Sequence, residues 1–422
     1  MTITANDPSR KSWVAISKES DFPIQNLPFG IFRTESNPAP RVCTAIGNYV
    51  ADLAVMNYLA LFDGLEIDNE VFNTRYLNDF MALGKITTRA VRNKLADIFD
   101  VNNKDAKDLS WHFLHPMDKV ELLLPIKVGD YTDFYSSIEH ATNVGTMFRG
   151  KENALMPNWK HLPVGYHGRS SSIIVSDTPV KRPKGQQLPA NEDTPIFGPS
   201  RLLDFELEMA FIVGQETELG QTVSTDNAED YIFGMVLFND WSARDIQKWE
   251  YVPLGPFLGK SFASTISPWV VTLDALEPFK VDGPTQDPQP LPYLQYNGKK
   301  NYDINLEVLI QPEHGEAKTV CRSNTKYLYW NNAQQLAHHT INGCNLNVGD
   351  MCGSGTISGP TPDSYGSMLE ISWRGTKPVS MPDGSERKFI QDGDTVIMKG
   401  WCEKEGIRIG FGEANGKVLP AD

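Results

Sequence analysis

Acidic and apolar residues alternate in the segment DFELEM at residues 204–209. Because successive side chains of a β-strand point to opposite faces, Asp204, Glu206 and Glu208 would share one face while the apolar residues face a core. Carboxylates held this close repel one another, and either solvent or a bound cation relieves the repulsion. Oxygen ligands of this kind suit a hard ion such as Mg²⁺ or Ca²⁺. The segment therefore predicts a metal site, with a solvated strand face as the alternative.

A further carboxylate, Asp240, follows directly on an apolar strand predicted at residues 231–238. It either caps the start of a helix or acts as a third metal carboxylate. If the next segment is helical, Asp240, Arg244, Gln247 and Tyr251 lie on one helical face. An acid, a cation, an amide and a phenol are an unusual set for core packing, which favours a functional face. A plain solvated face is the alternative.

Residues 130–149 combine one histidine with several carboxylates, two tyrosines and an arginine. Histidine is the natural general base near neutral pH, which makes His140 a candidate for proton transfer. A catalytic histidine needs a partner that orients its ring, and a lone histidine is more often structural than catalytic. The sequence alone does not show that partner.

These segments must be positioned by a scaffold whose first part mixes short strands with helices. Strands are predicted at residues 13–16 and 41–46, and helices at residues 52–61, 74–83 and 87–97. Asp52, Thr74 and Thr87 are residue types that cap helix starts well. A short apolar strand then ends at Pro125, and a polar segment follows it. We expect a domain boundary there.

The rest of the chain is rich in short apolar strands separated by Gly, Pro and Asn turns. Besides residues 231–238, strands are predicted at residues 172–175, 269–273, 305–310 and 395–398, a helix at 333–340, and a proline-rich loop at 278–292. This pattern predicts a sandwich, roll or barrel rather than a doubly wound sheet. The glycine-containing segments 255–261 and 353–359 lack the spacing of a P-loop or a dinucleotide-binding loop, so neither supports a nucleotide.

The net charge of −14 at pH 7 argues against nucleic acid or an anionic membrane as the main partner. No apolar run approaches the roughly 18 residues that span a bilayer, and the polar N-terminus lacks the apolar stretch of a signal peptide. The five cysteines are widely spaced and form no CxxC pair, which favours a reducing compartment over disulfides or a thiolate zinc site. We therefore expect a cytoplasmic protein.

Several of these segments together resemble the fumarylacetoacetase family. The matching segments are residues 133–137 with 140–143, then 162–169, 204–208, 239–245, 259–262, 353–359 and 366–370. They occur in order over essentially the whole chain. The ExE strand with a later aspartate is shared by a wider superfamily, whereas the segments around His140 and Glu370 and the long N-terminal part are more specific.

The resemblance implies a mainly β fold with some α, formed by an N-terminal SH3-like barrel at residues 1–124 and a C-terminal mixed β-roll at residues 125–422. It also implies a homodimer. By position, the implied metal ligands are Asp133, Glu206, Glu208 and Asp240, which would hold Mg²⁺, Ca²⁺ or both. The implied catalytic residues are His140, Glu370, Arg244, Gln247 and Lys260. The implied substrate contacts are Tyr135, Arg149, Tyr166, Arg244, Gln247, Tyr251, Lys260 and Thr356.

The activity implied by the resemblance is hydrolysis of a carbon–carbon bond in a small anionic 1,3-diketone, 4-fumarylacetoacetate, as the last step of tyrosine and phenylalanine catabolism. Such chemistry needs an activated water, an electrophile on the diketone oxygens and stabilisation of the departing enolate. One alternative keeps the metal site but makes the protein an acylpyruvate hydrolase, a decarboxylase or an isomerase. Another is a metal-binding protein without catalytic activity. The His140–Glu370 pair and the additional N-terminal domain weigh against the first alternative. The expected residue type at every matched catalytic position weighs against the second.

Overall fold

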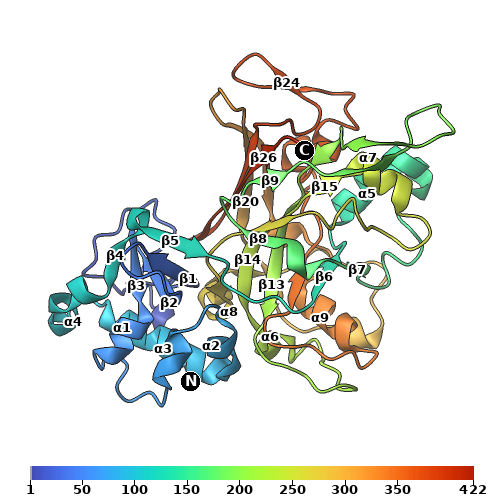
Figure 1. Cartoon of the computed structure of the whole chain (residues 1–422). Helices are drawn as coiled ribbons and strands as arrows, with labels where there is room; N and C mark the ends of the chain where they lie inside the picture. The colour runs from blue at the N-terminus through green and yellow to red at the C-terminus, as the bar shows by residue number, and fades with distance from the viewer. Residues whose placement is uncertain (1) are drawn as a thin grey trace.

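A curled five-stranded antiparallel sheet organises the N-terminal part of the computed structural model, which describes residues 2–422. Its strand order is β4 (Leu114–Pro116), β3 (Tyr49–Asp52), β2 (Arg41–Ile46), β1 (Phe29–Thr34) and β5 (Val120–Leu123). The two outer strands, β4 and β5, follow one another through a short 3₁₀ turn at Met117–Lys119. This arrangement is the expected SH3-like barrel, shown in blue and cyan in Figure 1. The strand predicted at residues 41–46 has those bounds.

Helices pack beside this sheet, and two of the predicted helix starts are wrong. The helices are α1 (Leu53–Tyr58), α2 (Asn78–Ala82), α3 (Gly84–Ile98) and α4 (Lys104–Asp108). Asp52 caps α1 as predicted, because its Oδ1 accepts the amide hydrogen of Val55 at 3.2 Å. Thr74 caps no helix; its hydroxyl donates to the carbonyls of Val71 before it and Tyr76 after it. Thr87 lies inside α3, which starts earlier because it continues almost directly from α2.

The strand predicted at residues 13–16 is absent. Only Ser12 makes a β-bridge, to Asp100. Trp13 donates its backbone amide to Phe99 and its indole nitrogen to Ile98, at the end of α3. The run therefore packs in part against a helix end, with Val14 buried, rather than pairing in a sheet, which periodicity alone does not distinguish.

An eight-stranded mixed sheet forms the centre of the larger C-terminal part (Figure 1). Its order is β7 (Gly165–His167), β6 (Tyr131–Phe134), β22 (Met351–Gly353), β13 (Leu207–Val213), β14 (Ile232–Asp240), β16 (Ser264–Ile266) and β8 (Ile173–Val175), with β17 (Val271–Thr272) also paired to β14. Two pairs, β22 with β6 and β16 with β8, are parallel. The mixed pairing matches the expected β-roll.

A second, five-stranded sheet contains β21 (Lys318–Asn324), β20 (Asn305–Gln311), β25 (Thr395–Lys404), β26 (Ile407–Leu419) and β9 (Val180–Lys181). Four two-stranded pairs complete the strands: β10 (Lys184–Gln187) with β11 (Ile196–Pro199), β12 (Leu203–Asp204) with β15 (Ser242–Ala243), β18 (Lys280–Val281) with β19 (Asn301–Tyr302), and β23 (Val379–Ser380) with β24 (Glu386–Arg387). The remaining α-helices are α5 (Ile138–Arg149), α6 (Ala228–Tyr231), α7 (Arg244–Glu250), α8 (Leu273–Leu276), α9 (Asn332–Thr340) and α10 (Met368–Ile371). Six predicted elements have counterparts in the structure: β8 for residues 172–175, β14 for 231–238, β17 for 269–273, β20 for 305–310, β25 for 395–398 and α9 for 333–340.

The central strands β13 and β14 are buried on both faces. Alternate residues of β13, such as Met209 and Phe211, enter the core shared with the five-stranded sheet. The opposite face, with Ala210 and Ile212, enters a core shared with the N-terminal part. Glu208 lies on that second face, because side chains two residues apart point the same way. The second face therefore changes from apolar to acidic along a single strand.

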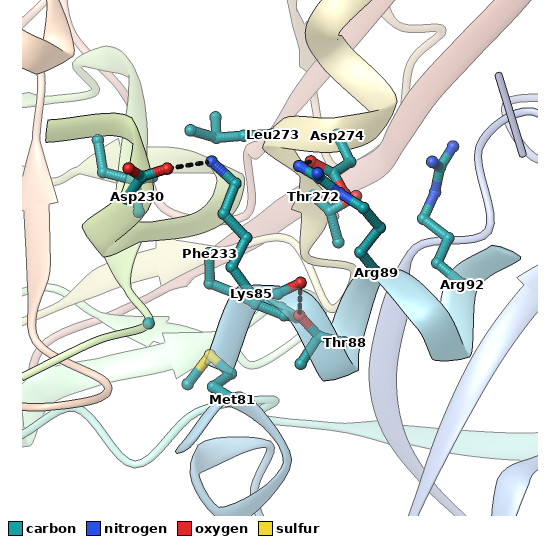
Figure 2. A pocket seen from close by; sticks show the side chains of 12 residues that line it. Met81, Lys85, Thr88, Arg89, Arg92, Asp230, Phe233, Thr272, Leu273 and Asp274 are labelled. Carbon is teal, nitrogen blue, oxygen red and sulfur yellow. Dashed lines mark hydrogen bonds and ion pairs between the residues drawn. The ribbon is translucent and has the colours of Figure 1, made fainter. Parts of the chain in front are cut away.

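Ion pairs also join the N-terminal part to the C-terminal part around a small cavity of about 20 Å³ (Figure 2). From α3, Lys85 contacts Asp230 at 2.8 Å, and Arg89 holds both carboxylate oxygens of Asp274 at 2.7 Å. Arg92, fully buried on the same helix, donates to backbone carbonyls near residue 25. This cavity has room for about one water molecule and lies away from the acidic face. Within residues 2–422, no helix combines the length and apolar character needed to cross a membrane.

Candidate active site

Four buried carboxylates converge at one end of the eight-stranded sheet. Asp133 comes from β6, Glu208 from β13 and Asp240 from the end of β14, while Glu206 lies in the short gap between β12 and β13. One oxygen of each lies within 4.8 Å of the corresponding oxygens of the others. All four residues are at most 5% exposed. Asp240 belongs to a strand, so of its two predicted roles the helix cap is wrong; α7 begins only at Arg244.

The cluster has the features of a cation site rather than of a self-contained hydrogen-bond network. Asp133 Oδ1 and Glu208 Oε1 are buried without a hydrogen-bond partner among the described residues. Gly353, on the strand between theirs, leaves the space these groups occupy, since a Cβ there would lie 2.8 Å from Asp133 Oδ1 and 3.1 Å from Glu208 Oε2. Converging carboxylate oxygens without donors are the ligands that hard divalent cations take. The residues present therefore fit a divalent metal ion.

Two cations border the cluster on one side. The Lys260 ammonium makes short contacts with both Glu206 and Asp240. Arg244 reaches Glu206 Oε1 with Nη2 at 2.8 Å and donates through Nη1 to Gln247 Oε1 at 3.2 Å. Asp204, predicted to share the acidic face, instead belongs to β12 and accepts from Arg244 Nε at 2.9 Å. The strand is interrupted after Asp204, so the alternation holds only for Glu206 and Glu208.

The electrostatics divide the carboxylates into two kinds. Burial and the neighbouring Asp240 raise the pKa of Asp133 well above its usual value, and burial together with Asp133 does the same to the pKa of Glu208. Burial opposes ionisation of Glu206 as well, but Lys260, Arg244 and His140 bring its pKa below the usual value. Without a cation, the raised pKa values favour the neutral forms of Asp133 and Glu208, and a bound divalent ion would favour their ionised forms.

The orienting partner of His140 is Glu370, 230 residues away in sequence. Ser137 caps α5 by accepting the amide hydrogen of His140 at 3.2 Å, which places the imidazole in the first helical turn. His140 Nδ1 donates to Glu370 Oε2 at 2.6 Å, and both side chains are buried. Although burial opposes ionisation of Glu370, the facing His140 and further hydrogen bonds keep the pKa of Glu370 below its usual value. Glu370 is therefore an ionised partner for the imidazole.

The other predicted contacts divide into those beside the cluster and those apart from it. Tyr166 donates to Asp240 Oδ2 at 3.1 Å, and the Tyr135 ring meets the His140 ring edge-on with centroids 5.3 Å apart. Arg149 instead donates to the carbonyls of Asn153 and Ala154. Tyr251 is 50% exposed beyond the end of α7. Thr356 is buried, and its hydroxyl has no partner within the described chain.

Sequence reasoning missed the groups that hold Glu370. Its carboxylate also accepts from Asn143 at 2.9 Å, from Ser367 at 2.9 Å and from Ser358. Asn143 lies three residues after His140 on α5, so its place on the same helical face could have been read from the spacing. Ser367 stands three residues before Glu370, the spacing of a helix-capping Ser-x-x-Glu segment, whereas Ser358 carries no such local signal. The segment 353–359 also contributes a contact to the acidic cluster that the sequence did not indicate. Gly355, at φ +76°, donates its amide hydrogen to Glu208 Oε2 at 2.9 Å.

Known proteins resemble this chain over almost its full length. The family profile described as fumarylacetoacetate hydrolase C-terminal matches residues 131–419, and the one described as fumarylacetoacetase N-terminal matches residues 25–125. Fumarylacetoacetase of Dictyostelium discoideum is 57% identical over 420 residues, covering 98% of each chain. The Caenorhabditis elegans protein of that name is 56% identical over 98% of this chain and 100% of its own, and the human one 53% identical over 97% and 99%.

Solved structures share the fold at much lower identity. A fumarylacetoacetate hydrolase from Exiguobacterium antarcticum superposes with a TM-score of 0.53 at 19% identity, covering 93% of this chain and 99% of its own. The structure of Cg1458 with inhibitor has a TM-score of 0.52 at 14% identity, covering 94% and 100%. At these identities the likeness concerns the fold alone.

Proposed function

The chain belongs to the fumarylacetoacetate hydrolase family, and from this premise we propose that it hydrolyses 4-fumarylacetoacetate to fumarate and acetoacetate. This reaction is the last step of tyrosine and phenylalanine catabolism. The observation that carries the proposal is the His140–Glu370 pair held beside four converging carboxylates. A metal-dependent acylpyruvate hydrolase, decarboxylase or isomerase, and a metal-binding protein without activity, are not favoured, because relatives that are 57% and 53% identical over nearly their whole length are fumarylacetoacetases.

The His140–Glu370 pair is suited to activating a water molecule. Because Nδ1 is engaged by Glu370, Nε2 is the ring nitrogen that takes the proton of the attacking water. The ionised Glu370 orients the ring and stabilises the imidazolium that forms. The oxygen of this water bonds to the carbonyl carbon of the fumaroyl group, and the adjacent carbon–carbon bond breaks. The electron pair of that bond leaves as the enolate of acetoacetate, which takes up a proton.

Charge that develops on the substrate is met by side chains next to the acidic cluster. Arg244, Gln247 and Lys260 are the donors placed to stabilise the enolate and the oxyanion. A divalent cation, when bound by Asp133, Glu206, Glu208 and Asp240, supplies Lewis-acid polarisation of the diketone oxygens. Tyr135, Arg149, Tyr166, Tyr251 and Thr356 are proposed as further substrate contacts. Arg149 and Tyr251 would have to turn toward the site when the substrate binds.

The proposal includes the cation, the oligomeric state, the compartment and the domain division. We propose Mg²⁺ or Ca²⁺ as the bound cation, because only carboxylates line the cluster. A homodimer in the cytoplasm follows from the family resemblance, and the five cysteines, all without a disulfide, are consistent with a reducing compartment. We also propose the division into domains at residues 1–124 and 125–422.

The direct test is incubation of the purified protein with fumarylacetoacetate and a divalent cation, with fumarate and acetoacetate measured as products. We expect stoichiometric release of both. An acylpyruvate offered in parallel should turn over more slowly. Preference for the acylpyruvate would favour the alternative enzyme class, and turnover of neither would favour a protein without catalytic activity.

A further inference from the structure

One carboxylate, that of Asp204, holds two separate parts of the candidate site. The side chain is fully buried at the end of β12. Oδ1 accepts the amide hydrogen of Met368 at 2.7 Å. Oδ2 accepts the amide hydrogen of Leu369 at 3.0 Å and the Nε hydrogen of Arg244 at 2.9 Å. Three donors from two segments more than 120 residues apart in sequence therefore meet on one group.

The first of these segments carries Glu370. The two amides bound by Asp204 are the first two of α10, a helix of only four residues, and Glu370 is the third. So short a helix has little hydrogen bonding of its own to fix it. Ser367, its N-cap residue, donates to Glu370 Oε2 at 2.9 Å. The position of the Glu370 carboxylate thus depends on how this turn is anchored, and Asp204 anchors its amides.

The second segment carries Arg244, whose guanidinium makes hydrogen bonds with two partners and an ion pair with a third. Nε donates a hydrogen bond to Asp204, and Nη1 donates one to Gln247 at 3.2 Å. Nη2 forms an ion pair with Glu206 at 2.8 Å. The planar fork of an arginine is fixed once two of its edges are engaged. Asp204 therefore sets the orientation in which Arg244 faces the acidic cluster.

We propose that Asp204 is a positioning residue that fixes the His140–Glu370 pair relative to Arg244. The water-activating pair and the guanidinium that meets the developing charge must face the same substrate atoms, although they come from different parts of the fold. Catalysis is sensitive to such placement: a displacement of about 1 Å can reduce the rate by ~10²-fold. The kinetic part of this inference rests on the proposed function.

Asp52 provides a matched control for a purely structural role. Like Asp204, it is buried, accepts from an arginine Nε on Oδ2, here Arg41 at 2.6 Å, and accepts a backbone amide at the start of a short helix. Asp52 lies in the N-terminal sheet, and within residues 2–422 the hydrogen bonds and ion pair of its side chain are with Arg41 and Val55, outside the candidate site. Asp204→Asn and Asp52→Asn should therefore lose comparable stability, and only the first should disturb the active site.

The test compares both variants with the wild type by turnover, cation affinity and the NMR signals of the His140 imidazole in histidine-labelled protein. His140→Ala identifies those signals among the eight histidines. For Asp204→Asn we expect kcat to fall by roughly 10- to 100-fold, cation affinity to stay within about two-fold of wild type, since Asp204 is not a ligand, and the His140 signals to shift or broaden. Asp52→Asn should leave kcat and the signals as in wild type.

The proposal is overturned if Asp204→Asn keeps kcat within about two-fold of Asp52→Asn, or if its His140 signals match those of wild type. Should Asp204→Asn not fold, Arg244→Gln replaces it, because Arg244 makes no hydrogen bond or ion pair with His140 or Glu370 within residues 2–422. The His140 signals should still shift in Arg244→Gln, and unchanged signals overturn the proposal. A wild type without turnover would defeat the proposed function, whereas the NMR comparison would still decide the role of Asp204.

Discussion

Among single residues, Glu370 has the most completely satisfied side chain of the candidate site. Its two oxygens accept from His140, Asn143, Ser358 and Ser367. A buried carboxylate with this many donors stays ionised because hydrogen bonds and the facing imidazole outweigh the loss of hydration. The same donors hold the carboxylate in one orientation, so the imidazole of His140 is fixed through it.

We predict that Glu370→Gln lowers turnover by about 10²- to 10⁴-fold while the substrate still binds, because the water is no longer activated. The double variant with His140→Ala should lose little more than His140→Ala alone, since residues that act as a unit are not additive. Steady-state turnover with the metal content checked in each protein measures this. Glu139→Gln, on the same helix, is the control and should stay near wild type. Multiplicative losses in the double variant would contradict a paired mechanism.

The acidic cluster predicts a pH-dependent cation affinity. Because burial and mutual repulsion raise the pKa values of Asp133 and Glu208, protons compete with the cation at a higher pH than at ordinary carboxylates. Affinity for Mg²⁺ or Ca²⁺ should therefore fall as the pH drops through these raised values, while surface carboxylates are still ionised. The stability of the cation-free protein depends on pH in the opposite direction. Asp133 and Glu208 bind protons more tightly in the folded state than in the unfolded chain, so stability decreases as the pH rises through their raised pKa values.

Titration calorimetry with cation-free protein, run at several values between pH 8 and about pH 5.5, measures the affinity. Glu208→Gln should weaken binding at every pH, because it removes a ligand without opening the core. An affinity that does not change over this range would show that the two carboxylates are not the ligands.

At the level of elements, helix α3 connects the N-terminal part to the central sheet. It carries Lys85 and Arg89 on one face, and both reach acids of the C-terminal part. The two pairs differ in burial: the side chain of Asp274 is 10% exposed and that of Asp230 is 64% exposed. Because the two ion pairs involve neighbouring residues of one helix, their effects on stability can be compared with burial as the main difference (Figure 2).

We predict that Asp274→Asn lowers the free energy of unfolding by about 1–3 kcal/mol, because it leaves the Arg89 guanidinium partly buried without its full partner. Lys85→Ala should cost less than about 1 kcal/mol, since that pair is largely hydrated. Urea unfolding of the two variants and the wild type compares them directly. Turnover should be unchanged in both, because the active site lies elsewhere on the sheet. Equal losses would mean that burial does not set the strength of these contacts.

At the scale of the whole molecule, the net negative charge opposes binding of the proposed anionic substrate, whereas cations at the site favour it. The chain carries −14 at pH 7, yet Lys260 and Arg244 lie buried beside the acidic cluster. Burial opposes protonation of both, but Asp240 and Glu206 raise the pKa of Lys260, and Glu206 and Asp204 raise that of Arg244. Both therefore stay charged at neutral pH. Attraction of an anionic substrate thus depends on the site itself and not on the overall field.

We predict a homodimer in solution. Sedimentation at micromolar protein should give a mass near twice the 47.2 kDa of one chain. Association stabilises the folded state by mass action, so the melting temperature should also rise with protein concentration. A monomer that persists over a wide concentration range would contradict the prediction.

The sequence by itself determined most of the predicted strands, the ExE alternation and the residue types of the site, because apolar periodicity and side-chain alternation are local properties. The strand at residues 41–46 and the facing of Glu206 and Glu208 follow from such patterns. The predicted helix start at Thr74 is wrong because its hydroxyl donates to the carbonyls of a local turn, and the one at Thr87 is wrong because α3 continues almost directly from α2.

Only the tertiary structure decided which distant groups meet. Asp204 continues the same alternation as Glu206, yet it belongs to a different strand pair and binds Arg244 instead of the cluster. Glu370 reaches His140 across 230 residues, and Gly353 makes room for carboxylates from both flanking strands. These contacts depend on strand pairing and on the packing of separate elements, and such long-range pairing leaves no period in the sequence for a local pattern to detect.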